Sequence, residues 1–497
     1  MERRTLLGGL ALGVPAGWLV RSGDSDPVVR TTAGAVRGRR AGGISMFAGV
    51  PYAAAPVGER RFRPPVPPAA WRGVRDAVRP GPAAPQSPSR LTQVVGPIRL
   101  PGQSEDCLSV NVWTPGLRGR RPVLVWLHGG AFVAGAGGQD WYDGVRLAAD
   151  GDLVVVTVNY RLGALGFLHA PDLGWSNAGL LDQLAALRWV RDNIAGFGGD
   201  PGRVTLAGQS AGALTALAMM SAPQARGLFH RVILQSTPTG IAPAAPAEAA
   251  AVTERYLAAL GMPPGEAYRL RDVPVEQLLA AQGVLMQAAA PLQLAPPFHL
   301  VAAGDVVAPD LVGAAGRVSH IGRLVGATRD EAAAWAVLDP RLRGVDEARA
   351  IEIARGFAGA GAEHEYARIS RTAPGAAPEL VLQLLATDHY FHRDVPRLAG
   401  HARSYAYRFD WHPAGNPLGA CHCLELPYVF GTLPAWRAAP MLAGADPDHE
   451  AALVTATLPA WAAFVHTGSP EHGGLPRWPR YDHRRTTMHI TEQPHVR

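Results

Sequence analysis

The stretch that decides the fold is residues 204–213, VTLAGQSAGA. Residues 204–207 are apolar and strand-like, and residues 211–220 have the composition of a helix. Between them, residues 208–212 (GQSAG) fit G-x-S-x-G, the tight turn that carries a nucleophilic serine between a strand and a helix. The pattern alone is weak, but this strand–turn–helix setting makes Ser210 a candidate nucleophile. The two glycines make room for the turn, and the helix N-terminus places positive potential beside the serine oxygen.

The alternation of strands and helices continues on both sides of this turn. Residues 122–127 (PVLVWL) and 153–158 (LVVVTV) are continuous apolar runs, typical of strands buried on both faces. Residues 180–194 have helical spacing, and alanine-rich residues at about 240–300 and 335–395 are expected to form helical cap insertions. The sequence therefore predicts an α/β fold, with a mostly parallel central sheet and helices on both faces. Further strands are expected at residues 232–234, 324–325 and 405–409.

Composition narrows the class of protein. The chain has 497 residues, of which 47% are hydrophobic and 18% charged, so a mainly disordered chain is excluded. Three cysteines exclude a disulfide scaffold. All 47 basic residues are arginine, which fits the codon bias of a GC-rich genome, and the missing lysine excludes a Ser–Lys dyad. Residues 1–80 hold 13 arginines against 5 acidic residues, whereas the remainder holds 34 against 36. The balanced body argues against a nucleic-acid partner.

The first residues have the pattern of an export signal. Arg3 and Arg4 precede an apolar run at residues 6–20, which is shorter than the ~20 residues that span a membrane. The arginine pair resembles a twin-arginine signal. We predict a signal peptide at residues 1–28 and an exported protein, with a cytoplasmic protein carrying an apolar tail as the alternative. No other segment reaches ~18 uninterrupted apolar residues, so we expect no integral membrane segment in the mature chain.

A second glycine-rich turn, His128-Gly129-Gly130-Ala131-Phe132, directly follows the strand predicted at residues 122–127. In lipases and esterases such a turn exposes backbone N–H groups to an oxyanion. One such donor lowers the transition-state energy by about 2.7–4 kcal/mol in a known hydrolase. We expect the oxyanion donors to be the N–H groups of Gly130, Ala131 and Ala211.

An acid and a base must follow Ser210 in the order serine, acid, histidine. Glu331 and its neighbour Asp330 both lie just past the strand expected at residues 324–325, and position alone leaves both open. His422 follows a late strand at the expected end of the sheet. It would take the proton of Ser210 while the acid holds its tautomer.

These motifs, taken together with others along the chain, resemble the type-B carboxylesterase family, α/β-hydrolases that include bacterial para-nitrobenzyl esterases and the cholinesterases. The resemblance runs from about residue 30 to residue 490, which implies that residues 29–497 form a single catalytic domain. The matching segments are FAGVPYA at 47–53, SEDCL at 104–108, NVW at 111–113, NYRLG at 159–163, Asn177, Asp182-Gln183, FGGDP at 197–201, HCLELPYVFG at 422–431, Trp461, Phe464, Gly468, Trp478-Pro479 and Tyr481.

The resemblance assigns roles to individual residues. It implies a catalytic triad of Ser210, His422 and Glu331, and it selects Glu331 over Asp330. A second serine, Ser236, would support the acid. Glu105 and Arg161 would form a buried ion pair with a structural role.

Several positions depart from the family pattern. Gln209 stands where GESAG has a carboxylate, which changes the electrostatics beside Ser210, and Ala332 replaces the usual glycine after the acid. Cys107 matches a disulfide cysteine, but Ala84 occupies its partner position, so that disulfide cannot form. No tryptophan lies between them, which argues against a choline ester as preferred substrate.

The sequence thus predicts a serine carboxylesterase that hydrolyses a small-molecule ester through an acyl-enzyme. An amidase, carbamate hydrolase or thioesterase could use the same triad, because specificity depends on the pocket walls. A non-catalytic adhesion module is disfavoured because all three triad residues are present. We expect no cofactor and no metal, since Cys421, His422 and Cys423 are too close in sequence to converge on one ion. A monomer and a dimer both remain open.

Overall fold

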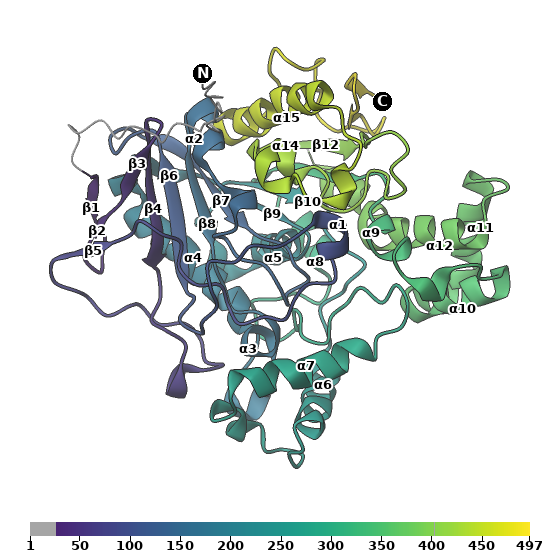
Figure 1. Cartoon of the computed structure of the whole chain (residues 1–497), viewed down its shortest axis with the longest axis horizontal. Helices are drawn as coiled ribbons and strands as arrows, with labels where there is room; N and C mark the ends of the chain where they lie inside the picture. The colour runs from purple at the N-terminus through teal and green to yellow at the C-terminus, as the bar shows by residue number, and fades with distance from the viewer. Residues whose placement is uncertain (1–25, 402) are drawn as a thin grey trace, which may run out of the picture.

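A mixed sheet of eleven strands runs through the described residues of the computed structural model, 26–401 and 403–497 (Figure 1). The predicted signal segment lies almost entirely in residues 1–25, outside that description. The strands of the large sheet, in chain order, are β3 (Arg39–Ala41), β4 (Ile44–Pro51), β6 (Ser109–Thr114), β7 (Arg121–Leu127), β8 (Val154–Val158), β9 (Gly199–Gln209), β10 (Arg231–Gln235), β11 (Gly322–Thr328), β12 (Ser404–Phe409), β13 (Thr487–Ile490) and β14 (His495–Val496).

The central strands of this sheet are parallel. The spatial order is β14-β13-β12-β11-β10-β9-β7-β8-β6-β4-β3, and every pair from β13 to β8 is parallel. The antiparallel pairs lie at the two edges. A small separate sheet is formed by β1 (Val28–Arg30), β2 (Ala35–Arg37) and β5 (Val74–Asp76). The predicted mostly parallel α/β sheet is confirmed.

The continuous apolar runs form strands because both faces of the sheet are covered. In β7, Val123, Val125 and Leu127 belong to one hydrophobic core, and Leu124 and Trp126 belong to a second core on the other face. Successive side chains of a strand point to opposite faces, so neither face of β7 can be polar.

Helices pack on each face of the sheet (Figure 1). The first core includes side chains of α4 (Ala178–Asn193) and α5 (Ala211–Ser221), as the helical spacing predicts. The second includes side chains of α2 (Val145–Gly151), α14 (Leu426–Phe430) and α15 (Pro447–Thr467). Two shorter helices are α1 (Thr92–Val95) and α3 (Gly163–Phe167).

The alanine-rich stretches are helical, as predicted, and project from the sheet. In Figure 1, α6 and α7 lie below it, and α10, α11 and α12 extend to its right. No helix of the described residues is long and apolar enough to cross a membrane. The helices between β10 and β12 are α6 (Pro246–Ala259), α7 (Val275–Gln287), α8 (Leu311–Gly316), α9 (Ala333–Ala336), α10 (Glu347–Ala358), α11 (Ala362–Thr372), α12 (Pro378–Thr387) and α13 (Val395–Ala399).

Candidate active site

Ser210 occupies the turn between β9 and α5 in a strained backbone conformation. Its φ is 56° and its ψ is −125°, a region that side-chain-bearing residues rarely adopt. A Cβ at Gly208 would lie 2.5 Å from the carbonyl carbon of Gly212, and a Cβ at Gly212 would clash with the carbonyl oxygen of Leu127. The two glycines therefore permit the turn, as the sequence pattern predicts.

The glycine-rich turn after β7 lies directly against Ser210. A Cβ placed on Gly129 would be 3.1 Å from the Cβ of Ser210. The carbonyl of Gly130 accepts hydrogen bonds from Val133 and Ala134, at 3.0 Å each, which fixes the turn. Within residues 26–401 and 403–497, the N–H groups of Gly130, Ala131 and Ala211 donate to no other group, so all three remain free to bind an oxyanion.

His422 and Glu331 form a buried pair at the carboxyl ends of β11 and β12. Nδ1 of His422 contacts Oε2 of Glu331, and the backbone N–H of Thr328 donates to Oε1 at 2.8 Å. Burial would raise the pKa of Glu331, but His422 and the Thr328 N–H outweigh it and hold that pKa below its ordinary value. Burial would lower the pKa of His422, but Cys423 and Glu331 raise it well above its ordinary value.

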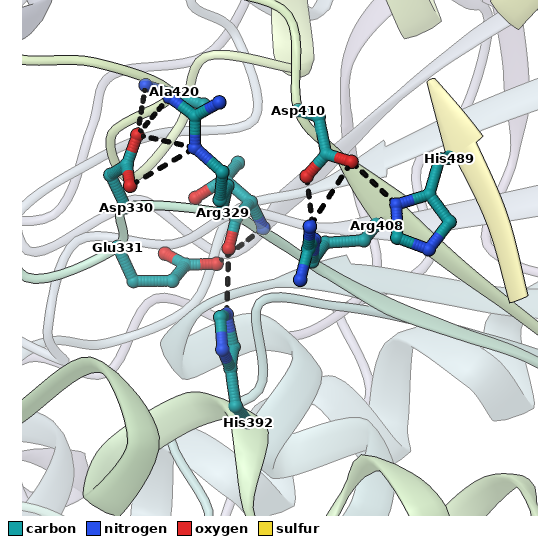
Figure 2. A network of polar contacts seen from close by, with 9 residues as sticks. Arg329, Asp330, Glu331, His392, Arg408, Asp410, Ala420 and His489 are labelled. Carbon is teal, nitrogen blue, oxygen red and sulfur yellow. Dashed lines mark hydrogen bonds and ion pairs between the residues drawn. The ribbon is translucent and has the colours of Figure 1, made fainter. Parts of the chain in front are cut away.

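Asp330, the rival acid, points away from this pair. Figure 2 shows its carboxylate against the Arg329 guanidinium, at 2.8 Å, and the backbone N–H of Ala420, at 2.9 Å. Asp330 thereby fastens the loop that carries His422 to the end of β11. The structure brings Glu331, and not Asp330, to the imidazole.

The second ring nitrogen of His422 faces Gln209. Its Nε2 lies 3.0 Å from the side-chain nitrogen of Gln209, and that nitrogen also lies 3.4 Å from the sulfur of Cys423. No hydrogen bond joins Ser210 and His422 among the described residues. In many hydrolases the hydrogen bond between the nucleophile and the base forms only when substrate binds.

Two aromatic rings enclose the imidazole, and sequence reasoning missed both. The rings of Trp335 and Phe391 lie 5.0 Å and 5.1 Å from that of His422, between centroids. Trp335 also lines a cavity of about 580 Å³, whose other walls come mainly from the segments 88–93, 287–294 and 338–341. Its position four residues after Glu331, within the short helix α9, is the only sequence signal that could have found it.

A second buried carboxylate, Glu425, lies behind His422. Its Oε1 accepts a hydrogen bond from Gln235 at 3.1 Å, and Trp461 donates to the other end of that amide at 2.8 Å. Oε2 has no hydrogen-bond partner among the described residues. Burial, aided by the negative charge of Glu331, raises the pKa of Glu425 to about 7.

The predicted ion pair between Glu105 and Arg161 is wrong. Glu105 pairs with Arg61 at 2.5 Å, and Arg161 forms a bidentate pair with Asp182 at 2.6 Å and 2.8 Å. A buried charge needs a partner, and each of these finds one on another segment of the chain. Asp182, a charge on the buried face of α4, was the available signal.

The three cysteines, Cys107, Cys421 and Cys423, are free and buried. Cys107 has no disulfide partner, as Ala84 predicts. Within the described part of the chain, no group of three or more His, Cys, Asp or Glu side chains is arranged to hold a metal ion.

Comparison with known proteins shows the family to which the chain belongs. The pattern of the carboxylesterase family matches residues 25–497. The chain belongs to the carboxylesterase family. This confirms the resemblance, and family membership makes the protein a carboxylic ester hydrolase.

Individual members of the carboxylesterase family are similar to this chain over nearly its whole length. The chain is 39% identical over 469 residues to a phenmedipham hydrolase of Pseudarthrobacter oxydans, covering 92% of this chain and 93% of that protein. It is 37% identical over 470 residues to the para-nitrobenzyl esterase of Bacillus subtilis (strain 168), covering 91% and 92%. A solved carboxylesterase of Geobacillus stearothermophilus has a TM-score of 0.83 at 37% identity, covering 95% and 97%. The α/β-hydrolase fold is therefore established.

Proposed function

We propose that the protein is a serine carboxylesterase in which Ser210, His422 and Glu331 form the catalytic triad. The observation that carries the proposal is the convergence of three features at the carboxyl ends of neighbouring parallel strands. These are a strained serine turn after β9, a glycine-rich turn with free N–H groups after β7, and a buried His–Glu pair beyond β11 and β12. Open α/β sheets place their ligands at this edge.

The first half of the reaction forms an acyl-enzyme. His422 withdraws the proton of the Ser210 hydroxyl as the oxygen attacks the ester carbonyl. The negative charge that develops on the carbonyl oxygen is bound by the N–H groups of Gly130, Ala131 and Ala211. Glu331 keeps the second imidazole proton on Nδ1 and stabilises the imidazolium, which then gives its proton to the leaving alcohol.

The second half repeats these steps with water. His422 withdraws a proton from water, the resulting hydroxide attacks the acyl carbon, and the acid leaves as the proton returns to Ser210. The buried hydroxyl of Ser236, which has no hydrogen-bond partner among the described residues, would support Glu331 by turning to donate to it. The cavity beside Trp335 would hold part of the ester, because a pocket of this volume accommodates a small organic molecule.

The test is a panel of short-chain p-nitrophenyl esters, each paired with its matched amide, on the purified protein. Ser210→Ala should abolish ester hydrolysis with the fold intact, as judged by circular dichroism. Retention of full activity by Ser210→Ala would exclude the proposed nucleophile. The ratio of ester to amide rates defines the leaving group that the site accepts.

Two wider proposals accompany the activity. Residues 29–497 act as a single catalytic domain, and residues 1–28 direct export. The arginine pair at the start of the chain supports export, and mass spectrometry of the protein secreted by cells that express the full chain would locate the cleavage site.

A further inference from the structure

The triad mechanism leaves one buried polar side chain beside His422 without a role. Gln209 is the last residue of β9, and it is 1% exposed. Its side-chain nitrogen lies 3.0 Å from Nε2 of His422, the nitrogen that must receive the Ser210 proton. The residue therefore contacts the reacting end of the base.

The contacts identify which end of the amide faces the histidine. An amide nitrogen carries two hydrogens and can satisfy two acceptors. The two atoms within reach are Nε2 of His422 and the sulfur of Cys423, at 3.0 Å and 3.4 Å. The amide oxygen lies on the opposite side, against Gly129. Gln209 thus donates to the ring, and a ring that accepts at Nε2 is the neutral imidazole with its proton on Nδ1.

The other groups around the ring favour its charged form. Cys423 and Glu331 raise the pKa of His422 against the lowering effect of burial, whereas a general base must be neutral to accept a proton. A neutral donor at Nε2 opposes this tendency, because protonation of the ring would bring two N–H groups face to face. The groups that face His422 are Glu331 beyond β11, Gln209 from β9, Cys423 and Glu425 on its own segment, and the uncharged rings of Trp335 and Phe391.

We propose that Gln209 is a positioning residue for His422, which holds the imidazole neutral at Nε2 and thereby extends ester hydrolysis to lower pH than a carboxylate at this position would allow. The inference rests on the proposed function, since it requires His422 to be the base. It gives a role to the glutamine that stands where the family pattern has glutamate. A glutamate here could only accept from the ring, which would stabilise the imidazolium.

Because Gln209 donates to Nε2 of His422, it competes with the Ser210 hydroxyl for that nitrogen. During acylation the serine O–H bond breaks, the O–C bond to the acyl carbon forms, and the proton moves to Nε2. The Gln209 N–H must leave Nε2 before that transfer. Removing the amide should therefore alter the pH dependence of the reaction and its rate separately.

The experiment compares four proteins: wild type, Gln209→Glu, Gln209→Leu and, as a matched charge control, Gln277→Glu at an exposed glutamine of α7. For each, kcat/KM for p-nitrophenyl butyrate is measured from pH 5 to pH 9 by titration of the released acid. A carboxylate in contact with the ring should move the midpoint of the acid limb upward by roughly one to two pH units in Gln209→Glu. Gln209→Leu should move it upward by less, and Gln277→Glu should leave it in place.

An unchanged midpoint in Gln209→Glu, or a downward shift in Gln209→Leu, would overturn the inference. A fluorophosphonate phosphonylates Ser210 with loss of fluoride. The rate of this inactivation over the same pH range reports the attack by Ser210 alone and gives a second reading of the same midpoint. Thermal unfolding of each variant shows whether it has folded. Failure of the proposed function is distinguishable, because it would appear as activity retained by Ser210→Ala in the wild-type background.

Discussion

Two buried histidine–carboxylate pairs lie at the same edge of the sheet, and only one of them lies beside the serine turn. His422 pairs with Glu331, and His489 pairs with Asp410 through Nδ1 at 2.5 Å. The carboxylates of both pairs follow neighbouring strands, β11 and β12, and all four side chains are less than 10% exposed. By residue type and burial alone the two pairs are almost equivalent.

The partners of each pair make the difference. Figure 2 shows Asp410 between His489 and the guanidinium of Arg408, which donates to it at 2.5 Å. Burial would raise the pKa of Asp410, but His489 and Arg408 outweigh it and lower that pKa. The ring of His489 stacks on His495, with centroids 5.3 Å apart. Glu331 has no arginine bound to it among the described residues, so its charge remains available to His422.

Both histidines use Nδ1 to contact the carboxylate, so the groups that face Nε2 decide whether the pair can act as a base. Nε2 of His422 faces Gln209, next to the serine turn and the free N–H groups. The His489 pair has a neutralising arginine and no serine turn, and it joins β12 to β13. Substitutions in and around both pairs test this distinction.

Replacing the histidines should give the largest contrast. We expect His422→Ala to lower kcat by roughly 10⁴-fold or more, because loss of the base in a serine hydrolase costs about that much or more. His489→Ala should keep kcat within about threefold of wild type. The measurement is kcat for p-nitrophenyl butyrate at pH 8. Comparable losses in the two variants would contradict the distinction between the pairs.

Replacing the carboxylates should give the next contrast. In Glu331→Gln the Thr328 N–H holds the amide oxygen, so the amide nitrogen faces Nδ1 of His422 and donates to it. His422 then adopts the wrong tautomer, and kcat should fall by roughly 10³- to 10⁴-fold. Asp410→Asn, the matched control on the neighbouring strand, should leave kcat within about tenfold. The same assay decides, with circular dichroism to show that both variants fold. A nearly active Glu331→Gln would remove Glu331 from the triad.

The serine turn and the buried strands could be predicted from the sequence because they depend on local patterns. The turn at Ser210 was predictable because Gly208 and Gly212 serve sterics within five residues, and the strands were predictable because both faces of the sheet are buried. The fold class and the Glu331–His422 contact followed from the order of motifs and the family resemblance.

What the sequence could not give depends on pairing between distant segments. Glu105 had a choice of buried arginines, and only the packing of the loops selects Arg61 over Arg161. Gln209 and His422 are 213 residues apart, and nothing local marks their contact. Position left Asp330 and Glu331 equivalent, and the structure separates them because Asp330 is held by Arg329 and the Ala420 N–H.

Another substitution probes Glu425, the second carboxylate near His422, which has no counterpart beside His489 among the described residues. The folded pKa of Glu425 is about 7 against an ordinary 4.5, so the folded protein holds a proton that the unfolded chain loses. The free energy of unfolding should therefore fall as pH rises through this window, by about 3 kcal/mol for this group. Glu425→Gln mimics the protonated form and should be more stable than wild type at pH 8 by that amount, with little difference at pH 5.

Urea unfolding at both pH values tests the prediction for Glu425→Gln, and Glu347→Gln at the exposed start of α10 is the control. A stability difference independent of pH would show that Glu425 is already ionised at pH 5.

The smallest effect is expected at the Asp410 pair, and it should have the opposite sign. A carboxylate whose pKa is lowered by folding adds stability above its ordinary pKa of 3.8 and loses that contribution as pH falls through the folded value. Asp410→Asn removes the charge that pairs with Arg408 and His489, so it should lower the free energy of unfolding by about 1–3 kcal/mol at neutral pH. Urea unfolding should give the same deficit at pH 7 and pH 5 and a smaller one at pH 3. An increasing deficit toward pH 3 would mean that Asp410 is protonated in the folded protein. In that case the His489 pair would carry no charge, and its similarity to the His422 pair would be one of shape alone.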